Sequence, residues 1–249
     1  MRNLGSNKKG KQPMTKRMQG FTLVEIAIVL VIIGLLLGGI LKGQEMITQA
    51  KIKNVIADFS GVSAAYHGYQ DRYRAIPGDD PNAGTRWTTA PQAFPGSGNG
   101  VVEGTYNTAC PTVVALGTAE TCKWWDDLRR AGFVSGNGPQ QPFNAVTGLI
   151  GVQTGDGAGP PSGPVLGAGG AGAGGFSGLI ICSANLPDKI AIAVDTQMDD
   201  GQRLSGSVRG QLQAAPNPAI AVDATAPSSG GAANYAETGT NTYVLCRAF

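Results

Sequence analysis

One long apolar segment constrains this chain more than any other feature of its sequence. The 21 residues from Phe21 to Leu41 contain a single charged side chain, Glu25. A helix of about 20 consecutive apolar residues is long enough to cross a lipid bilayer. A carboxylate in lipid costs about 2.5–3.5 kcal/mol at the bilayer centre and less toward the interface. We therefore expect a membrane-spanning helix in which Glu25 has a functional partner.

The residues before this segment indicate its orientation. Positions 1–20 contain six basic side chains and no acid. A basic segment that leads directly into an apolar helix stays on the cytoplasmic side of the membrane. A secretory signal has a shorter apolar core with a cleavage site of small residues after it, and no such site follows Leu41. The pattern is therefore not that of an ordinary secretory signal.

The junction between the two segments, residues 16–25, has the sequence KRMQGFTLVE. This sequence resembles the signal of type IV prepilins, which pilins and pseudopilins share. The resemblance implies that a prepilin peptidase cleaves between Gly20 and Phe21 and methylates the new amino terminus at Phe21. It also implies a role for Glu25 in subunit assembly. The alternative is a plain signal anchor, in which Glu25 reaches the interface or is protonated.

The implied cleavage creates a second charge near Glu25. The ammonium of Phe21 and the carboxylate of Glu25 are each costly in lipid, and together they neutralise one another. If the two groups belong to neighbouring subunits, their pairing fixes the axial register between those subunits.

The helical pattern continues past Leu41. Apolar residues recur every three or four positions as far as Tyr73, with polar residues between them. We expect one helix over residues 22–73, about 78 Å long, that ends before Pro77. The resemblance implies an α+β, pilin-like fold, in which this helix packs on an antiparallel sheet. The predicted divisions are a removed leader (1–20), a transmembrane and polymerisation helix (21–41), the amphipathic half of the same helix (42–74) and a globular head (75–249).

Three glycines, Gly34, Gly38 and Gly39, lie inside the apolar half of this helix. Each lowers helix propensity by about 1 kcal/mol relative to alanine. They either allow neighbouring helices to approach closely or mark a place where the helix melts locally under packing or tension. We hypothesise that any local melting centres on residues 34–43.

The head combines long loops with a few regular elements. Residues 77–106 and the Gly-rich residues 147–177 have the composition of surface loops. Residues 123–133 are expected to form a short helix. Residues 186–195 are expected to form a helix or a strand, and a short helix is favoured because Pro187 suits a first turn. Residues 178–182 and 242–249 are expected to form strands. The adjacent Trp124 and Trp125 favour core packing over a ligand platform.

Four cysteines in an exported domain predict two disulfides, for which three connectivities exist. Cys110 and Cys122 are 12 positions apart and are expected to close a small local loop. Cys182 and Cys246 then bridge two predicted strands and tie the carboxy-terminal segment to the sheet. A carboxy-terminal segment held by a disulfide also resembles the pilin family.

Charge and histidine content argue against nucleic-acid binding and catalysis. Six of the 19 basic side chains lie in the leader, so the remaining 229 residues hold 13 basic and 17 acidic side chains, without an evident basic face. His67, the only histidine, is expected in a partly buried position on the long helix, which supports neither a zinc site nor a Ser-His-Asp triad. We expect no enzymatic activity, because adjacent acids diverge and make poor paired-carboxylate sites: Asp79/Asp80, Asp126/Asp127 and Asp199/Asp200.

One acidic turn is a candidate cation site. Asp195, Asp199 and Asp200 precede a glycine and offer the hard oxygen ligands that Ca²⁺ prefers, although their spacing is not that of an EF-hand. The alternative is a solvated acidic turn. Asp79 and Asp80 are better explained by turn formation than by metal binding. Ca²⁺ is thus the one candidate cofactor.

These features together predict a structural subunit of a type IV pilus that polymerises with copies of itself. The resemblance implies three further partners, namely the prepilin peptidase, the pilus assembly platform with its ATPase, and the inner membrane that holds the precursor before the filament becomes extracellular. One alternative is a pseudopilin of a type II secretion system or a minor pilin. The other is a binding module, namely a membrane-anchored adhesin or a DNA-uptake subunit that uses the loops of residues 77–177.

Overall fold

The computed structural model describes residues 20, 22–168, 172–224 and 234–249. The chain divides into two compact units, Met1–Met46 and Ile47–Phe249. The predicted leader and Phe21 lie outside the described residues, apart from Gly20. The described residues form four helices and four strands, and one of the helices is long and apolar enough to cross a membrane.

The long helix α1 runs over Leu23–Tyr73 and contains 51 residues. It starts one residue later than predicted and ends at the predicted Tyr73, where Arg74 turns into the left-handed region with φ 53°. The helix is continuous through residues 34–43, so local melting there stays a prediction for the assembled subunit. The buried face of α1 follows the predicted stripe: Ile52, Val55, Phe59, Val62, Ala65 and Tyr69.

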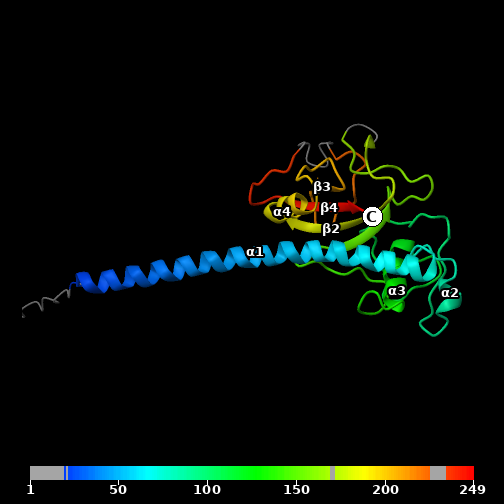
Figure 1. Cartoon of the computed structure of the whole chain (residues 1–249), viewed down its shortest axis with the longest axis horizontal. Helices are drawn as coiled ribbons and strands as arrows, with labels where there is room; N and C mark the ends of the chain where they lie inside the picture. The colour runs from blue at the N-terminus through cyan, green and yellow to red at the C-terminus, as the bar shows by residue number, and fades with distance from the viewer. Residues whose placement is uncertain (1–19, 21, 169–171, 225–233) are drawn as a thin grey trace, which may run out of the picture. The chain divides into compact units, whose positions relative to one another are not determined.

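The second unit is built on a four-stranded antiparallel sheet (Figure 1). Its order is β1-β2-β4-β3, and the strands are β1 (Ile150–Thr154), β2 (Leu179–Pro187), β3 (Val208–Leu212) and β4 (Thr242–Ala248). The two central strands are therefore the two that the sequence predicted. Helix α1 from Ile47 onward lies along one face of this sheet.

Alternating residues of the central strands serve two separate cores, because neighbouring side chains in a strand point to opposite faces. Ile181 and Leu245 pack with the buried face of α1. Ile180 and Val244 pack on the opposite face, which loop residues such as Leu166 cover. Helix α1 and the loops thus protect the sheet on both sides.

Three shorter helices complete the described fold. Helix α2 covers Ala83–Arg86, α3 covers Glu120–Arg130 and α4 covers Asp188–Met198. Helix α3 begins three residues earlier than predicted and is joined to β1, since the Thr121 hydroxyl donates a hydrogen bond to the Val152 carbonyl at 2.6 Å. Trp124 and Trp125 are fully buried in the core, which confirms the packing interpretation.

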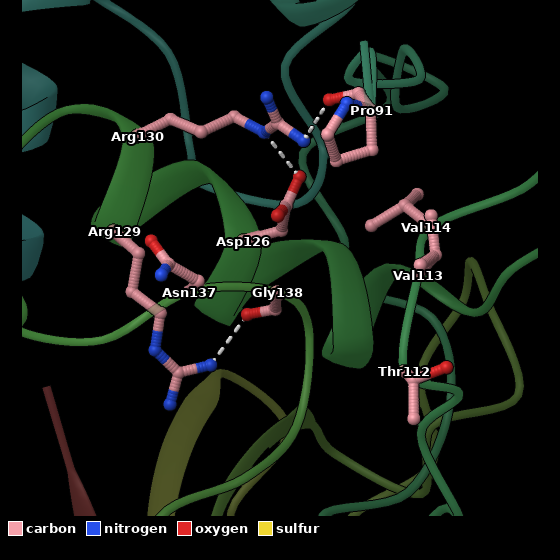
Figure 2. A pocket seen from close by; sticks show the side chains of 9 residues that line it. All are labelled: Pro91, Thr112, Val113, Val114, Asp126, Arg129, Arg130, Asn137 and Gly138. Carbon is pink, nitrogen blue, oxygen red and sulfur yellow. Dashed lines mark hydrogen bonds and ion pairs between the residues drawn. The ribbon is translucent and has the colours of Figure 1, made fainter.

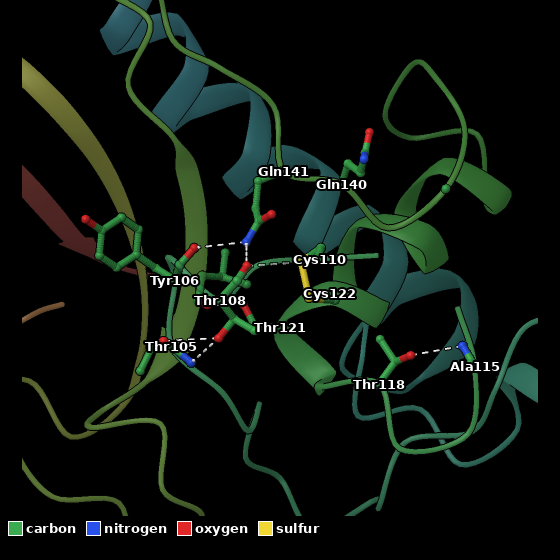
Figure 3. The surroundings of a disulfide bond; sticks show 12 residues. Thr105, Tyr106, Thr108, Cys110, Ala115, Thr118, Thr121, Cys122, Gln140 and Gln141 are labelled. Atoms are coloured by element: carbon green, nitrogen blue, oxygen red, sulfur yellow. Dashed lines mark hydrogen bonds between the residues drawn. A yellow bond between two sulfur atoms is a disulfide. The ribbon is translucent and has the colours of Figure 1, made fainter. Parts of the chain in front are cut away.

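Both predicted disulfides are present. Cys110–Cys122 joins the preceding loop to α3 (Figure 3). Cys182–Cys246 joins the central strands at directly paired positions and fixes the carboxy-terminal strand to β2.

The Gly-rich segment 147–177 is less of a surface loop than its composition predicts. It contains the fully buried strand β1, and both Val165 and Leu166 are inaccessible to solvent. Strand β3 was not predicted at all. The physical reason in both cases is that short strands interrupted by glycine lack a clear alternation of apolar and polar residues.

Candidate functional site

The first turn of α1 holds Glu25 in a reciprocal capping arrangement with Thr22. The Thr22 backbone N–H and hydroxyl both donate to Glu25 Oε2, at 2.8 and 2.7 Å. The Glu25 N–H in turn donates to the Thr22 hydroxyl at 3.3 Å. This is the capping box of a Thr and a Glu three positions apart. It directs the Glu25 carboxylate to the amino-terminal end of the helix, toward the predicted cleavage point.

Thr22 is a residue that sequence interpretation missed. The Thr-x-x-Glu spacing was the signal that could have identified it, because that spacing precedes an apolar run in capping boxes. Among the described residues, Thr22 alone forms hydrogen bonds with the Glu25 side chain. Thr22 therefore positions the one carboxylate of the apolar segment.

Gly20 is exposed, and an added Cβ would meet no described atom within 4 Å. The described residues therefore impose no steric requirement for glycine at this position. A requirement for glycine would have to come from a protein that recognises the junction. Phe21, the predicted methylated residue, lies outside the described residues.

The apolar half of α1 is exposed along its whole length within the first unit. Leu23 is 86% exposed, and no part of the most apolar 18-residue window of the helix is buried. An exposed apolar surface of this extent marks contact with lipid or with other proteins.

The molecule thus belongs to a class of proteins with a long, exposed apolar segment at the start of the amino-terminal helix and an α+β head. Residues 15–41 match the family described as the prokaryotic N-terminal methylation motif, which is the prepilin signal of type IV pilins and pseudopilins. Searches of curated proteins and of solved structures gave no significant match to this chain. The motif supports a pilin-like or pseudopilin protein, and it implies a structural role rather than an enzymatic one.

The three predicted calcium ligands converge in space. Asp195, Asp199 and Asp200 each bring a carboxylate oxygen within 4.8 Å of the others. Asp195 is fully buried, which corrects the picture of an entirely solvated turn. Burial raises the pKa of Asp195 to about 6, although hydrogen bonds from Tyr235 and Gly201 oppose this effect.

The three carboxylates supply the oxygen ligands that Ca²⁺ prefers. Most of these oxygens, however, already accept hydrogen bonds from the protein. Asp195 accepts hydrogen bonds from the Tyr235 hydroxyl and the Gly201 N–H. Asp199 Oδ2 accepts from two backbone N–H groups, at 2.5 and 2.9 Å. Both oxygens of Asp200 also accept hydrogen bonds. The same oxygens would have to serve a cation that needs six to eight ligands.

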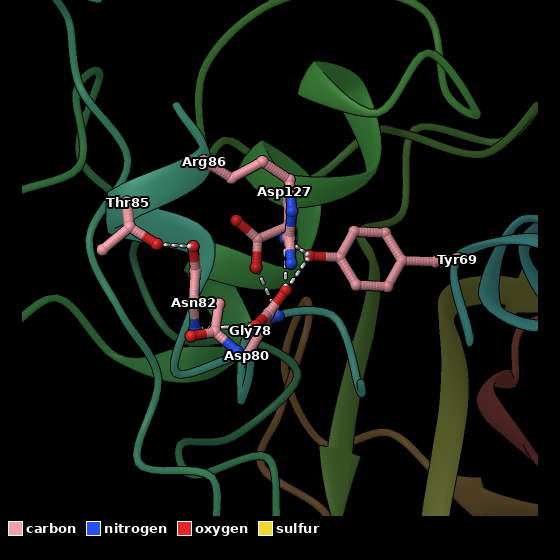
Figure 4. Close-up of polar contacts among 7 residues, drawn as sticks. All are labelled: Tyr69, Gly78, Asp80, Asn82, Thr85, Arg86 and Asp127. Carbon is pink, nitrogen blue, oxygen red and sulfur yellow. Dashed lines mark hydrogen bonds and ion pairs between the residues drawn. The ribbon is translucent and has the colours of Figure 1, made fainter. Parts of the chain in front are cut away.

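The two acids after α1, Asp79 and Asp80, accept hydrogen bonds from other parts of the head, and Figure 4 shows those of Asp80. Asp80 is fully buried and accepts from the Tyr69 hydroxyl at 2.7 Å and from Arg86 Nη1 at 2.5 Å. Asp79 accepts from three successive backbone N–H groups, those of residues 98–100. Turn formation therefore explains only part of their role, because these carboxylates also fix the end of α1 to later segments.

Asp126 and Asp127 diverge as predicted, whereas the predicted divergence is wrong for Asp199 and Asp200, which bring carboxylate oxygens within 4.8 Å of one another. Asp126 pairs with Arg130, whereas Asp127 accepts the Gly78 N–H at 2.8 Å. Burial raises the pKa of Asp127 to about 8, and the negative charges of Asp126 and Asp80 add to that effect. His67 is exposed on α1 rather than partly buried, because it lies outside the stripe that packs on the head.

Proposed function

We propose that this chain is a structural subunit of a type IV pilus. In this proposal a prepilin peptidase cleaves after Gly20 and methylates Phe21, and the mature subunit polymerises through residues 21–41. The observation that carries the proposal is the coincidence of two features at the same place. The methylation motif at residues 15–41 overlaps the exposed apolar half of α1, and the only acid of that half, Glu25, is held at the first turn of the helix.

The charge pair gives the polymer its register. Cleavage would release an ammonium at Phe21, four positions before Glu25. The capping box keeps the Glu25 carboxylate at the end of the helix where this ammonium forms. In an apolar filament core the two charges stabilise each other, and each is costly without its partner.

The decisive experiment compares Glu25→Ala with Glu25→Gln in cells that contain the assembly machinery. We expect both variants to insert in the membrane and to be cleaved, because the apolar segment is unchanged. Both should reduce sheared filaments at least about tenfold, since an unpaired ammonium in the apolar core costs several kcal/mol. The Gln side chain can keep part of the capping box, whereas Ala cannot. An equal loss of filaments in both variants would therefore show that the charge of Glu25, and not the capping box, is required for assembly.

The amino terminus provides a second measurement. Mass spectrometry of the assembled protein should find a methylated Phe21, and Gly20→Leu should leave an uncleaved precursor. If the filaments and the cell envelope contain only chains that begin at Met1, the proposal is wrong.

A pseudopilin of a type II secretion system and a minor pilin carry the same motif and are the second candidate. Abundance separates these functions. A subunit that forms most of a sheared filament fraction is a major pilin, whereas a trace component is a minor pilin or a pseudopilin. In all three cases the precursor is held in the inner membrane and the partners are the peptidase and the assembly platform with its ATPase.

A further inference from the structure

A cavity of about 340 Å³ lies beside α3, within the second unit (Figure 2). One wall is formed by the α3 side chains Asp126, Arg129 and Arg130. The backbone segment 112–114, within the loop closed by the Cys110–Cys122 disulfide, faces it from the other side. Its volume lies in the range of small-molecule sites.

Both guanidinium groups are fixed by the protein itself. Arg130 donates through Nε to Asp126 at 2.5 Å and through Nη2 to the Pro91 carbonyl at 2.6 Å. Arg129 donates through Nη1 to the carbonyls of Gly138 and Gln140, at 2.5 and 2.7 Å, and through Nε to the Ser135 carbonyl at 3.3 Å, which leaves its Nη2 donors. An arginine has five N–H donors in a planar fork. Each group is therefore held in place and retains donors for a ligand.

The charge of the lining favours a monoanion. The cavity is lined by two arginines and one acid, Asp126, whose side chain is 3% exposed. The formal charge among the described lining residues is therefore +1. A carboxylate matches this charge and the forked geometry of arginine, whereas a phosphate dianion would exceed the charge available.

The other walls suit a compact polar ring. Thr112 and Asn137 offer an exposed hydroxyl and an exposed amide, and Pro91 and Val113 supply apolar surface. A sugar ring presents hydroxyls at its edge and C–H groups on its faces, so it can use both kinds of wall. We propose that this cavity binds an acidic monosaccharide of the uronate class, with the carboxylate at the arginine side.

The test uses the full-length chain in detergent micelles and D-glucuronate as the probe. Isothermal titration should show glucuronate binding at least about tenfold more tightly than D-glucose, which lacks the carboxylate, and than acetate, which lacks the ring. Equal affinities for glucuronate and glucose would overturn the carboxylate assignment. Affinity for acetate or phosphate as high as for glucuronate would show an unspecific anion site and would also overturn it.

Asn137→Asp is the variant that tests the location. It adds a negative charge to the cavity lining in an exposed side chain of nearly the same shape. Two like charges near a protein surface repel by up to about 4 kcal/mol at 4 Å, so we expect glucuronate affinity to fall at least about tenfold. Asn54→Asp, an equally exposed change on α1, is the matched control and should leave affinity unchanged.

Unchanged glucuronate affinity in Asn137→Asp, or an equal loss in Asn54→Asp, would place the site elsewhere and contradict the proposal. Near-ultraviolet circular dichroism of both variants verifies the fold. The inference is independent of polymerisation, because filament assembly and glucuronate affinity are measured separately.

Discussion

Asp127 is a buried carboxylate whose surroundings favour its protonated form. Its side chain is almost inaccessible, and burial raises its pKa to about 8, while the Gly78 N–H acts in the opposite direction. The folded chain therefore holds a proton on Asp127 up to about pH 8 that the unfolded chain loses near pH 4. The free energy of unfolding should consequently fall as the pH rises from 4 through 8.

We predict that Asp127→Asn removes this part of the pH dependence. Asparagine imitates the protonated acid, and its oxygen can still accept the Gly78 N–H. The variant should match the parent at about pH 3, below the pKa of this acid in the unfolded chain, and be more stable at pH 9 by on the order of 2 kcal/mol, since one pKa unit corresponds to about 1.4 kcal/mol. Denaturant unfolding of the full chain in micelles at both pH values measures this. A variant less stable than the parent at pH 9 would contradict it.

The pKa and the hydrogen bonds of Asp195 lead to a prediction about Ca²⁺ binding at the acidic turn. Its raised pKa shows that the protein donors around it do not fully offset burial, and a bound cation would lower that pKa. Because at least five of the six oxygens of the acidic turn already accept hydrogen bonds, we expect EDTA to leave the unfolding midpoint unchanged. A midpoint lowered by EDTA and restored by CaCl₂ but not by MgCl₂ would instead establish a calcium site.

At the scale of elements, the two disulfides constrain chain segments of very different length. Cys182–Cys246 spans 64 positions and Cys110–Cys122 spans 12. In the loop-entropy description, a crosslink stabilises the fold by restricting the unfolded chain, and the longer loop contributes more. The longer crosslink also joins the two central strands of the sheet.

We predict that replacing both Cys182 and Cys246 by alanine lowers the free energy of unfolding by about 4 kcal/mol. The same replacement at Cys110 and Cys122 should cost about 3 kcal/mol. Denaturant titration of the two double variants tests the order of the effects. A larger loss for the shorter loop would show that local packing around α3, and not chain entropy, determines the contribution of these bonds.

The sequence could predict those elements whose stabilising contacts follow a regular period. The stripe of α1 and the apolar central strands β2 and β4 are of this kind. The edge strands β1 and β3 were missed because each contains a glycine that tertiary contacts require. A Cβ on Gly151 would lie 2.1 Å from the Tyr106 carbonyl, and one on Gly210 would lie 2.7 Å from the Tyr235 hydroxyl. Such close approaches join distant segments and leave no local pattern.

The site residues also divide into those with a regular spacing in the sequence and those that only tertiary contacts bring together. The junction at Gly20 and Glu25 has a fixed spacing and could be predicted, as could the cysteine pairs. The bond from Tyr69 to Asp80 and the placement of Arg129 and Arg130 around a cavity depend on how the loops fold. The carboxylates at positions 79 and 80 were interpreted as turn residues for this reason, since their main donors lie up to 21 positions away.

At the scale of the whole molecule, the division into two units predicts an independent head. Fully buried residues of α1 begin at Ile52, inside the second unit, within the described part of the helix. A chain that starts at Ile47 therefore keeps both described cores and both disulfides. We expect it to unfold within about 4 °C of the full-length chain, since a loss below 1 kcal/mol shifts the midpoint of a domain this size by about 2–4 °C.

The same truncation should abolish filament formation, because it removes the methylation motif and the exposed apolar helix together. Calorimetry of the truncated and full-length chains in the same detergent measures the midpoint, and electron microscopy of sheared material measures assembly. A truncated chain that loses cooperative unfolding would show that the head depends on residues before Ile47. If truncated chains still form filaments, the apolar half of α1 is dispensable for polymerisation, and the assembly surface lies on the head.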